Sequence, residues 1–157
     1  MSATLLSINN YYYPRGGAEV AFLRHNGMLH DAGWSVVPFA MNHTKNLGGA
    51  QRSDFVAELE YGRENETFLT RLRKGGKAVY SFEARSKLAR LIDRAAPDLV
   101  HAHNVYHHLS PSVLGLVHQR GIPLVMTLHD LKIACPAYSM LTHDGICERC
   151  RDGRLYQ

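Results

Sequence analysis

Two adjacent glycines that follow a short apolar stretch are well placed to hold a ligand. Residues 4–8 are apolar and β-branched enough to form a buried strand, and residues 13–19 lead from this strand into an amphipathic run. Unpaired amides at a helix start attract anions, and glycine lets a ligand approach the backbone or lets φ become positive. We therefore expect Gly16 and Gly17 to form a phosphate-binding turn. An ordinary tight turn is the alternative, because neither G-x-G-x-x-G nor G-x-x-x-x-G-K-[ST] is present.

Histidines gather near the ends of later apolar stretches. Five of the ten lie close together in the sequence: His101, His103, His107, His108 and His129. An H-x-H pair can place two imidazoles on one face of a strand, but no carboxylate at a suitable spacing completes a metal site. We favour a single histidine that reaches a sugar hydroxyl or a phosphate. The alternative is a hydrogen-bonded packing residue, above all for His101 and for His25 on the apolar face of the first helix.

Three cysteines form the pattern C-x₁₁-C-x₂-C: Cys135, Cys147 and Cys150. Two thiolates two residues apart can bind one zinc ion, so a structural, non-catalytic zinc site is one interpretation of the loop 135–157. Such a site needs a fourth ligand, which His143 could provide. Free thiols are an equal alternative, and a disulfide is disfavoured in a cytoplasmic protein.

The elements that position these residues alternate in type. Strands are expected at residues 4–8, 34–41, 97–103 and 122–128, and helices at 18–32, 77–96 and 110–121, with shorter helices at 55–59 and 67–72. Gly33 and Gly121 are stop signals, and Ser110 is a predicted N-cap with Pro111 at the first helical position.

The two longest helices are expected to bury apolar stripes against a sheet. The first stripe consists of Ala18, Ala21, Phe22, Met28, Leu29 and Ala32, and the second of Val79, Phe82, Ala89 and Ile92. Alternating strands and helices predict an α/β fold, a Rossmann-like open parallel sheet with helices on both faces. Ligands bind at the carboxyl edge of such sheets, where the loops 16–17, 101–108 and 129–130 should converge.

Length and composition fit one globular domain. The 157 residues are 45% hydrophobic and 20% charged, which is ordinary for a soluble protein and unlike a disordered chain. No apolar run approaches the roughly 18 residues of a membrane span, and the first residues lack the basic lead of a signal peptide. We expect a cytoplasmic protein.

The basic charge is concentrated in one segment. The chain has 18 − 14 = +4 charges, and between Arg63 and Arg94 nine Lys or Arg stand against four Asp or Glu, which leaves −1 elsewhere. A solvated surface helix, with Glu83 and Lys87 as an i,i+4 pair, explains this charge. Peripheral contact with anionic lipid at the inner face of the membrane is the sharper alternative. Nucleic acid is disfavoured, because no nucleic-acid motif accompanies the charge.

Four segments together resemble the amino-terminal domain of bacterial glycosyltransferase family 4 enzymes. They are residues 10–19, 97–104, 121–125 and 127–130, the last followed by Cys135-Pro136. Their order and spacing match, and the resemblance covers nearly the whole chain. It implies the first, mainly acceptor-binding domain of a GT-B protein, in which two Rossmann-like domains face one another.

The resemblance also implies residue roles. Gly16 and Gly17 would contact the donor diphosphate, with Glu19 either part of that loop or a helix cap. His129 would approach the transferred sugar, and Asp130 would orient its loop. His103, Asn104 and Tyr106 would line the acceptor side.

We therefore expect an enzyme of polysaccharide or cell-envelope biosynthesis that transfers a sugar, with retention and without a metal, from a nucleoside-diphosphate sugar to a polysaccharide or lipid-linked acceptor. The family's E-x₇-E motif and nucleoside pocket belong to a second domain, and the chain ends at Gln157. The first domain is thus expected to be incomplete at its C-terminal end, and inactive alone. The alternative is a non-catalytic Rossmann-like module that binds an anion or a protein partner.

Overall fold

The computed structural model describes residues 2–48, 52–58, 76, 79–106, 108–135 and 137–151. The predicted helix at 67–72 and His107 lie outside these residues. The chain divides into two compact units, Met1–Thr127 and Leu128–Gln157, and each is considered by itself.

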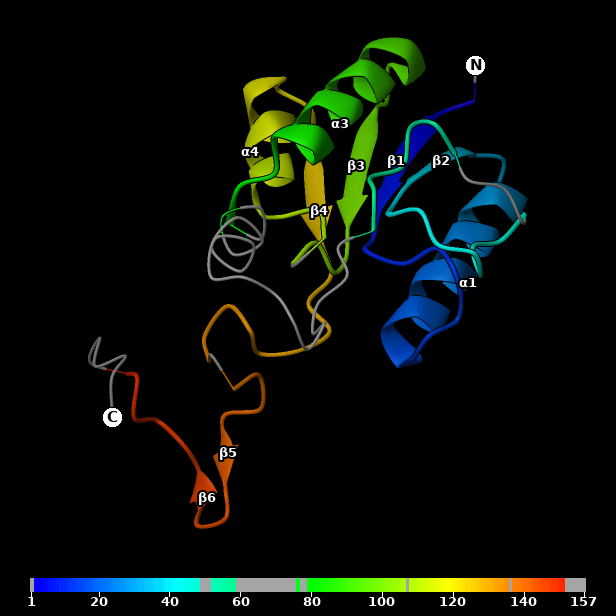
Figure 1. The fold of residues 1–157 in the computed structure, drawn as a ribbon. Helices are drawn as coiled ribbons and strands as arrows, with labels where there is room; N and C mark the ends of the chain where they lie inside the picture. The colour runs from blue at the N-terminus through cyan, green and yellow to red at the C-terminus, as the bar shows by residue number, and fades with distance from the viewer. Residues whose placement is uncertain are drawn as a thin grey trace. The chain divides into compact units, whose positions relative to one another are not determined.

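The first unit is built on a four-stranded parallel sheet (Figure 1). The strand order is β2-β1-β3-β4, formed by β1 (Thr4–Ile8), β2 (Ser35–Phe39), β3 (Leu99–Ala102) and β4 (Leu124–Met126). In register, Leu6 of β1 lies beside Val37 of β2 and Val100 of β3. The predicted Rossmann-like parallel sheet is confirmed, with each strand shorter than or equal to its expected range.

Helices cover both faces of this sheet, as predicted. Helix α1 (Gly17–Asp31) lies on one face, and α3 (Phe82–Ala95) and α4 (Ser112–Gln119) lie on the other (Figure 1). Alternation along the strands explains the division. Leu6, Ile8 and Val100 belong to the main apolar core with residues of α3 and α4, whereas Ser7 turns to the opposite face and donates a hydrogen bond from its Oγ to Asn26 Oδ1 of α1 at 2.6 Å.

The apolar stripe predicted for α1 is largely wrong. The buried residues of this helix are Glu19, Phe22 and Asn26, while Met28 is 68% exposed. Polar side chains occupy this interface because the facing strand positions are themselves polar and offer hydrogen-bond partners. Apolar spacing was therefore an incomplete guide to the buried face of α1.

The stripe predicted for α3 is correct at Ala89 and Ile92, which contact the core, but wrong at its first two positions. Val79 and Phe82 are 74% and 79% exposed, and the helix instead buries Ala84, Leu88, Leu91 and Ile92. The helix begins at Phe82 because the Ser81 hydroxyl caps it, accepting a hydrogen bond from Ala84 N at 3.2 Å.

Ser110 does not have the predicted capping role. Its φ is +67°, and its Oγ accepts a hydrogen bond from Ser81 N at 2.9 Å, so it connects the starts of α3 and α4. The N-cap of α4 is Pro111, and the helix begins at Ser112. The stop signals were correct, because Gly33 and Gly121 both adopt positive φ.

The helix expected at 55–59 is absent from its described residues, 55–58. Val56 forms a parallel bridge with Met41, and both Phe55 and Val56 are buried. In this short pairing, which follows β2, Val56 N donates to Ala40 O at 3.0 Å and Asn42 N donates to Val56 O at 2.7 Å.

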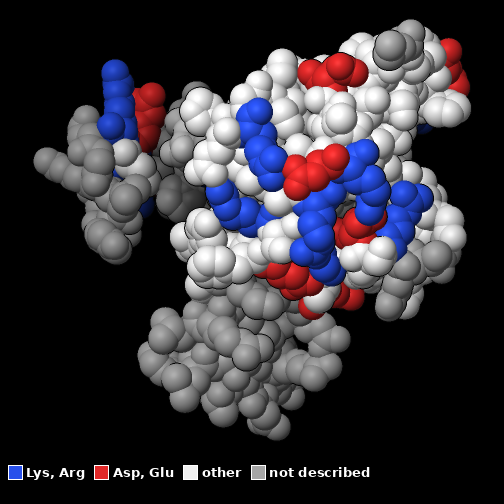
Figure 2. Space-filling view, turned by 90° about the horizontal axis from the view of Figure 1, so that it is seen from above, with Lys and Arg blue, Asp and Glu red and all other residues white. Residues whose placement is uncertain are grey.

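Helix α3 carries the cations of the basic segment that the structure describes. Figure 2 shows Lys and Arg side chains interleaved with acidic ones on this face. Arg94 pairs with Asp54 at 2.6 Å, and Lys87 pairs with Glu83 at 3.2 Å, which confirms the predicted i,i+4 pair. This pairing favours the solvated surface helix. Among the described residues, no helix is long and apolar enough to cross a bilayer.

The second unit contains one small hairpin. Strands β5 (Leu141–Thr142) and β6 (Gly145–Ile146) pair antiparallel, and Gly145 has a φ of +119° at the turn. A positive φ is readily adopted by glycine and explains the tight turn at this position.

Candidate functional site

The two glycines lie at the start of α1, as predicted. Gly16 is the N-cap with φ −157° and ψ −170°, and Gly17 is the first helical residue. Neither has a positive φ, so the positive φ that glycine permits is not used at these two positions. What they provide is space: a Cβ at Gly17 would meet no atom within 4 Å. A ligand can therefore approach the backbone here.

The first turn of α1 is suited to an anion. No side chain caps it, and the first helical hydrogen bond runs from Val20 N to Gly16 O at 3.0 Å. The backbone amides of residues 17–19, which precede Val20 in the helix, make no hydrogen bond within the helix. They carry the positive end of the helix dipole. Arg15 precedes this turn and carries a full positive charge, and its guanidinium carbon lies 4.3 Å from the centre of the Tyr11 ring.

Glu19 lies in the same turn and is only 7% exposed. Its Oε2 would be 3.4 Å from a Cβ placed on Gly16, so the carboxylate folds back over the N-cap residue. A negative charge is stabilised there by the helix dipole, without a side-chain capping hydrogen bond.

Asparagines connect the loops that follow β1 and β3. Asn10 N donates to Asn104 O at 2.7 Å, and Asn104 N donates to Asn9 Oδ1 at 3.1 Å. The Asn10 side-chain amide also donates to the Tyr106 carbonyl. The start of the loop between β1 and α1 therefore contacts the loop after β3. The sequence analysis gave Asn9 and Asn10 no such role, and their position directly after a buried strand was the available signal.

The residues predicted for the acceptor side differ in exposure. Asn104 and Tyr106 are half-buried, but His103 is only 3% exposed and its ring packs 5.2 Å from that of Phe22. His103 thus lies behind the surface that Asn104 and Tyr106 help to form.

Tyrosines line the approach to the α1 turn. The Tyr11 and Tyr13 ring centres are 5.5 Å apart, and Tyr13 stacks on His43 at 4.7 Å. Tyr11 Oη is 3.1 Å from His108 Nε2. Burial raises the pKa of Tyr11 and of Tyr13 above the ordinary value, and the nearby Arg15 charge opposes this rise. Both phenols are therefore neutral hydrogen-bonding groups at physiological pH.

Comparison with models of protein families identifies the family of this chain. The family model described as Glycosyltransferase Family 4 matches residues 15–144, which include the α1 turn and the loops after β3 and β4. The chain belongs to glycosyltransferase family 4. No curated protein matched it.

His129 and Asp130 of this glycosyltransferase domain lie at the start of the second unit. His129 is half-buried, and Asp130 Oδ1 accepts a hydrogen bond from Lys132 N at 2.9 Å. That bond forms a local turn over residues 130–132, and the orienting role of Asp130 stays a prediction. In the first unit, Thr127 N donates to Ala102 O at 2.9 Å, so β4 brings the chain to the carboxyl edge before this turn. The predicted meeting of the 129–130 loop with the other two stays a prediction.

The cysteines of the glycosyltransferase domain line one cavity of about 360 Å³, together with Glu148. All three are free thiols, and Cys135 is buried. His143 does not line this cavity: its side chain is 87% exposed and its Nε2 lies 2.9 Å from Asp144 Oδ1. The hairpin turn thus holds His143 away from the role of fourth ligand.

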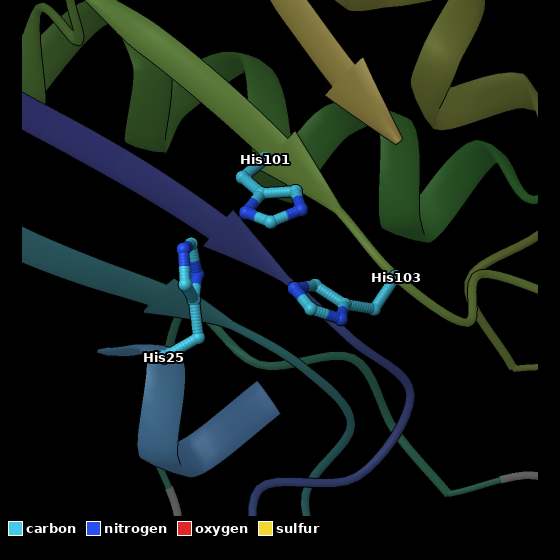
Figure 3. Close-up of side chains that lie close together, drawn as sticks. All are labelled: His25, His101 and His103. Atoms are coloured by element: carbon cyan, nitrogen blue, oxygen red, sulfur yellow. The ribbon is translucent and has the colours of Figure 1, made fainter. Parts of the chain in front are cut away.

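Three histidines form a cluster that sequence reasoning missed. His25 of α1, His101 of β3 and His103 just after β3 each offer a ring nitrogen within 4.8 Å of the others (Figure 3). The sequence showed the H-x-H pair, and we looked for a carboxylate to complete it. The third imidazole comes from α1, and only the packing of α1 on the sheet brings it there.

Proposed function

We propose that this chain forms the acceptor-side domain of a GT-B glycosyltransferase and also contacts the donor diphosphate. The enzyme would transfer a sugar, with retention, from a nucleoside-diphosphate sugar to a polysaccharide or lipid-linked acceptor. The observation that carries the proposal is the start of α1. There the space beside Gly17 is open, and the first backbone amides of the helix have no hydrogen-bond partner within the helix. This turn lies within the segment that matches glycosyltransferase family 4.

The α1 turn would act where negative charge develops during sugar transfer. As the bond between the sugar and the donor phosphate breaks, negative charge builds on the leaving nucleoside diphosphate. The amides of Gly16 and Gly17, the helix dipole and the Arg15 charge would offset it without reorganising. Glu19 repels the same anion, so its carboxylate would stabilise the start of α1 through the helix dipole rather than bind the donor.

The remaining roles concern the sugar and the acceptor. His129 would approach the transferred sugar, and the Asp130 turn would hold its loop. Asn104 and Tyr106 would contact the acceptor from a loop that Asn10 fixes. His103, buried behind them, would act as a positioning residue. None of these contacts requires a metal ion.

Binding at the α1 turn can be tested by NMR titration of the chain with inorganic pyrophosphate and with nucleoside-diphosphate sugars. We expect the amide signals of residues 16–19 to shift. Gly17→Ala should weaken binding at least about tenfold, because the methyl group enters the ligand space. Gly27→Ala is the matched control, since a Cβ at Gly27 also meets no atom within 4 Å. Absence of shifts at residues 16–19, or equal binding by both variants, would refute the proposed turn.

Transfer itself is best assayed in the intact gene product with a panel of nucleoside-diphosphate sugars. His129→Ala should lower kcat by about 10²-fold or more if the histidine acts at the reacting centre. Turnover like that of the wild type in this variant would show that His129 does not act at the reacting centre. Pyrophosphate binding without any transfer would instead favour the non-catalytic binding module.

We further propose a structural zinc ion at Cys135, Cys147 and Cys150. The shared cavity supports it, because thiolates must converge to bind one ion. Glu148, which lines the same cavity, is the candidate for the fourth ligand. Metal analysis of freshly purified protein should find zinc that is lost in Cys147→Ser/Cys150→Ser, and an ion content unaffected by that change would refute this site.

A further inference from the structure

Three imidazoles meet between α1 and the sheet, in the first unit of the chain. The ring centres of His25 and His101 are 4.7 Å apart, and those of His101 and His103 are 4.3 Å apart. Figure 3 shows the three rings directed toward a common space from α1, from β3 and from the segment after β3. His101 and His103 are buried and His25 is half-buried. Bulk water is therefore largely excluded from the cluster.

Each histidine of the cluster offers one ring nitrogen to the shared space. His101 Nε2 lies 2.8 Å from Thr127 Oγ1. When Nε2–H donates to that hydroxyl, His101 Nδ1 carries the lone pair that a metal ion requires. Within the described part of the chain, His25 Nδ1 is buried without a hydrogen-bond partner. A buried polar atom in that state is costly unless a ligand satisfies it.

We propose that His25, His101 and His103 bind one divalent transition-metal ion, with Zn²⁺ as the reference ion. Neutral imidazoles are preferred ligands of Zn²⁺ and of its late first-row neighbours. Nitrogens bound to one tetrahedral zinc ion are about 3.4 Å apart, given Zn–N bonds of about 2.0–2.1 Å. The nitrogens of the cluster lie within 4.8 Å of one another, so ring rotations can close the site.

The surroundings provide a route for the ion and a fourth coordination position. His25 and His101 line a cavity of about 230 Å³ whose other walls are apolar. Water or a small ligand can enter through this cavity and complete a tetrahedral site. Thr127 acts as a positioning residue, because its hydroxyl holds the orientation of the His101 ring.

The ion would tie α1 to β3. Since α1 begins with the Gly16-Gly17 turn and β3 ends in the loop of Asn104, an ion here fixes the two elements that form the candidate site. It binds the folded chain and not the unfolded one, so it raises stability. The three histidines belong to the first unit, and the three cysteines belong to the second.

The test uses the 157-residue chain with Cys135→Ser, Cys147→Ser and Cys150→Ser, so that thiols cannot bind the ion. After chelator treatment and dialysis against Zn²⁺ or Co²⁺, we expect one bound ion per chain and a Tm raised by several degrees. Adding His25→Gln should lower the affinity at least about 100-fold. His118→Ala, an exposed histidine on α4, is the matched control and should bind as before.

Thr127 offers an independent check. Thr127→Val should weaken binding about 10- to 100-fold, and Thr127→Ser, which keeps the hydroxyl, should restore it. Absence of a saturable ion in the thiol-free chain, or an ion that His25→Gln does not weaken, overturns the proposal. If His25→Gln does not fold, ring ¹⁵N shifts in the thiol-free chain decide, because Zn²⁺ must move the signals of three histidines.

Discussion

Burial keeps the phenols of Tyr11 and Tyr13 neutral beside the α1 turn. A tyrosine pKa that is higher in the folded than in the unfolded state stabilises the fold below the unfolded value of 10.0. That contribution is lost as the pH rises through the folded pKa. We therefore predict that the free energy of unfolding falls more steeply above pH 10 in the wild type than in Tyr11→Phe/Tyr13→Phe. Denaturant titrations between about pH 8 and 11 measure this slope, and equal slopes would contradict the prediction.

Substitution by alanine should have opposite effects on stability at Gly27 and at Gly33. Gly27 lies within α1 with open space around it, so Gly27→Ala should raise the free energy of unfolding by about 0.5–1 kcal/mol. Gly33 follows α1 with a φ of +89°, so Gly33→Ala should lower that free energy by about 1–2 kcal/mol. Urea denaturation of both variants measures these changes, and a shared sign would contradict the prediction.

At the scale of elements, the start of α3 depends on Ser81. Its hydroxyl accepts the hydrogen bond from Ala84 N, and the side chain is buried. Ser81→Ala should therefore lower the free energy of unfolding by about 1 kcal/mol. Ser86→Ala is the control, because Ser86 is exposed on the same helix and should change stability by less than about 0.5 kcal/mol. Equal effects of the two changes would show that the cap contributes nothing.

The charges of α3 can be tested against membranes. Arg94 is paired with Asp54, and Arg120 with Asp93 at 2.8 Å, so these cations have acidic neighbours. We expect weak sedimentation with vesicles that contain phosphatidylserine, and stronger sedimentation after Asp54→Asn/Asp93→Asn, since the freed cations attract anionic lipid. Strong, salt-sensitive binding of the unaltered chain would instead support peripheral membrane contact.

At the scale of the whole molecule, the chain consists of two compact units with different sources of stability. The first unit has a parallel sheet and an apolar core. The described part of the second unit has a hairpin whose strands are two residues long, and a cavity lined by cysteines. A structural zinc ion would supply the stability that so small a unit cannot obtain from apolar burial.

This difference predicts selective proteolysis. In Cys147→Ser/Cys150→Ser, limited digestion should cleave rapidly within residues 128–151, while the fragment that contains residues 2–127 persists. Mass spectrometry of the products over time measures the two rates. Unchanged cleavage in the second unit would show that these thiols do not support it.

Most of the fold could be predicted from the sequence alone. The apolar stretches and glycine stops located all four strands of the parallel sheet and the three described helices, because backbone propensity and apolar periodicity are local properties. The glycine pair at the start of α1 and the family resemblance could also be predicted from the sequence, since both depend on short motifs. Helix faces were predicted less well: the burial of Glu19 and Asn26 depends on partners in the strands, which periodicity does not record.

The tertiary structure decided which distant residues meet. It joined the Asn9–Asn10 and Asn104 loops, turned Ser110 from a cap into a link between two helices, and left His143 on an exposed hairpin. It also brought His25 to His101 and His103. These contacts depend on strand order and on the packing of α1 across the sheet, and such long-range geometry is not encoded in the spacing of any single segment. The sequence by itself determined the elements and the family, and the packing of those elements determined the sites.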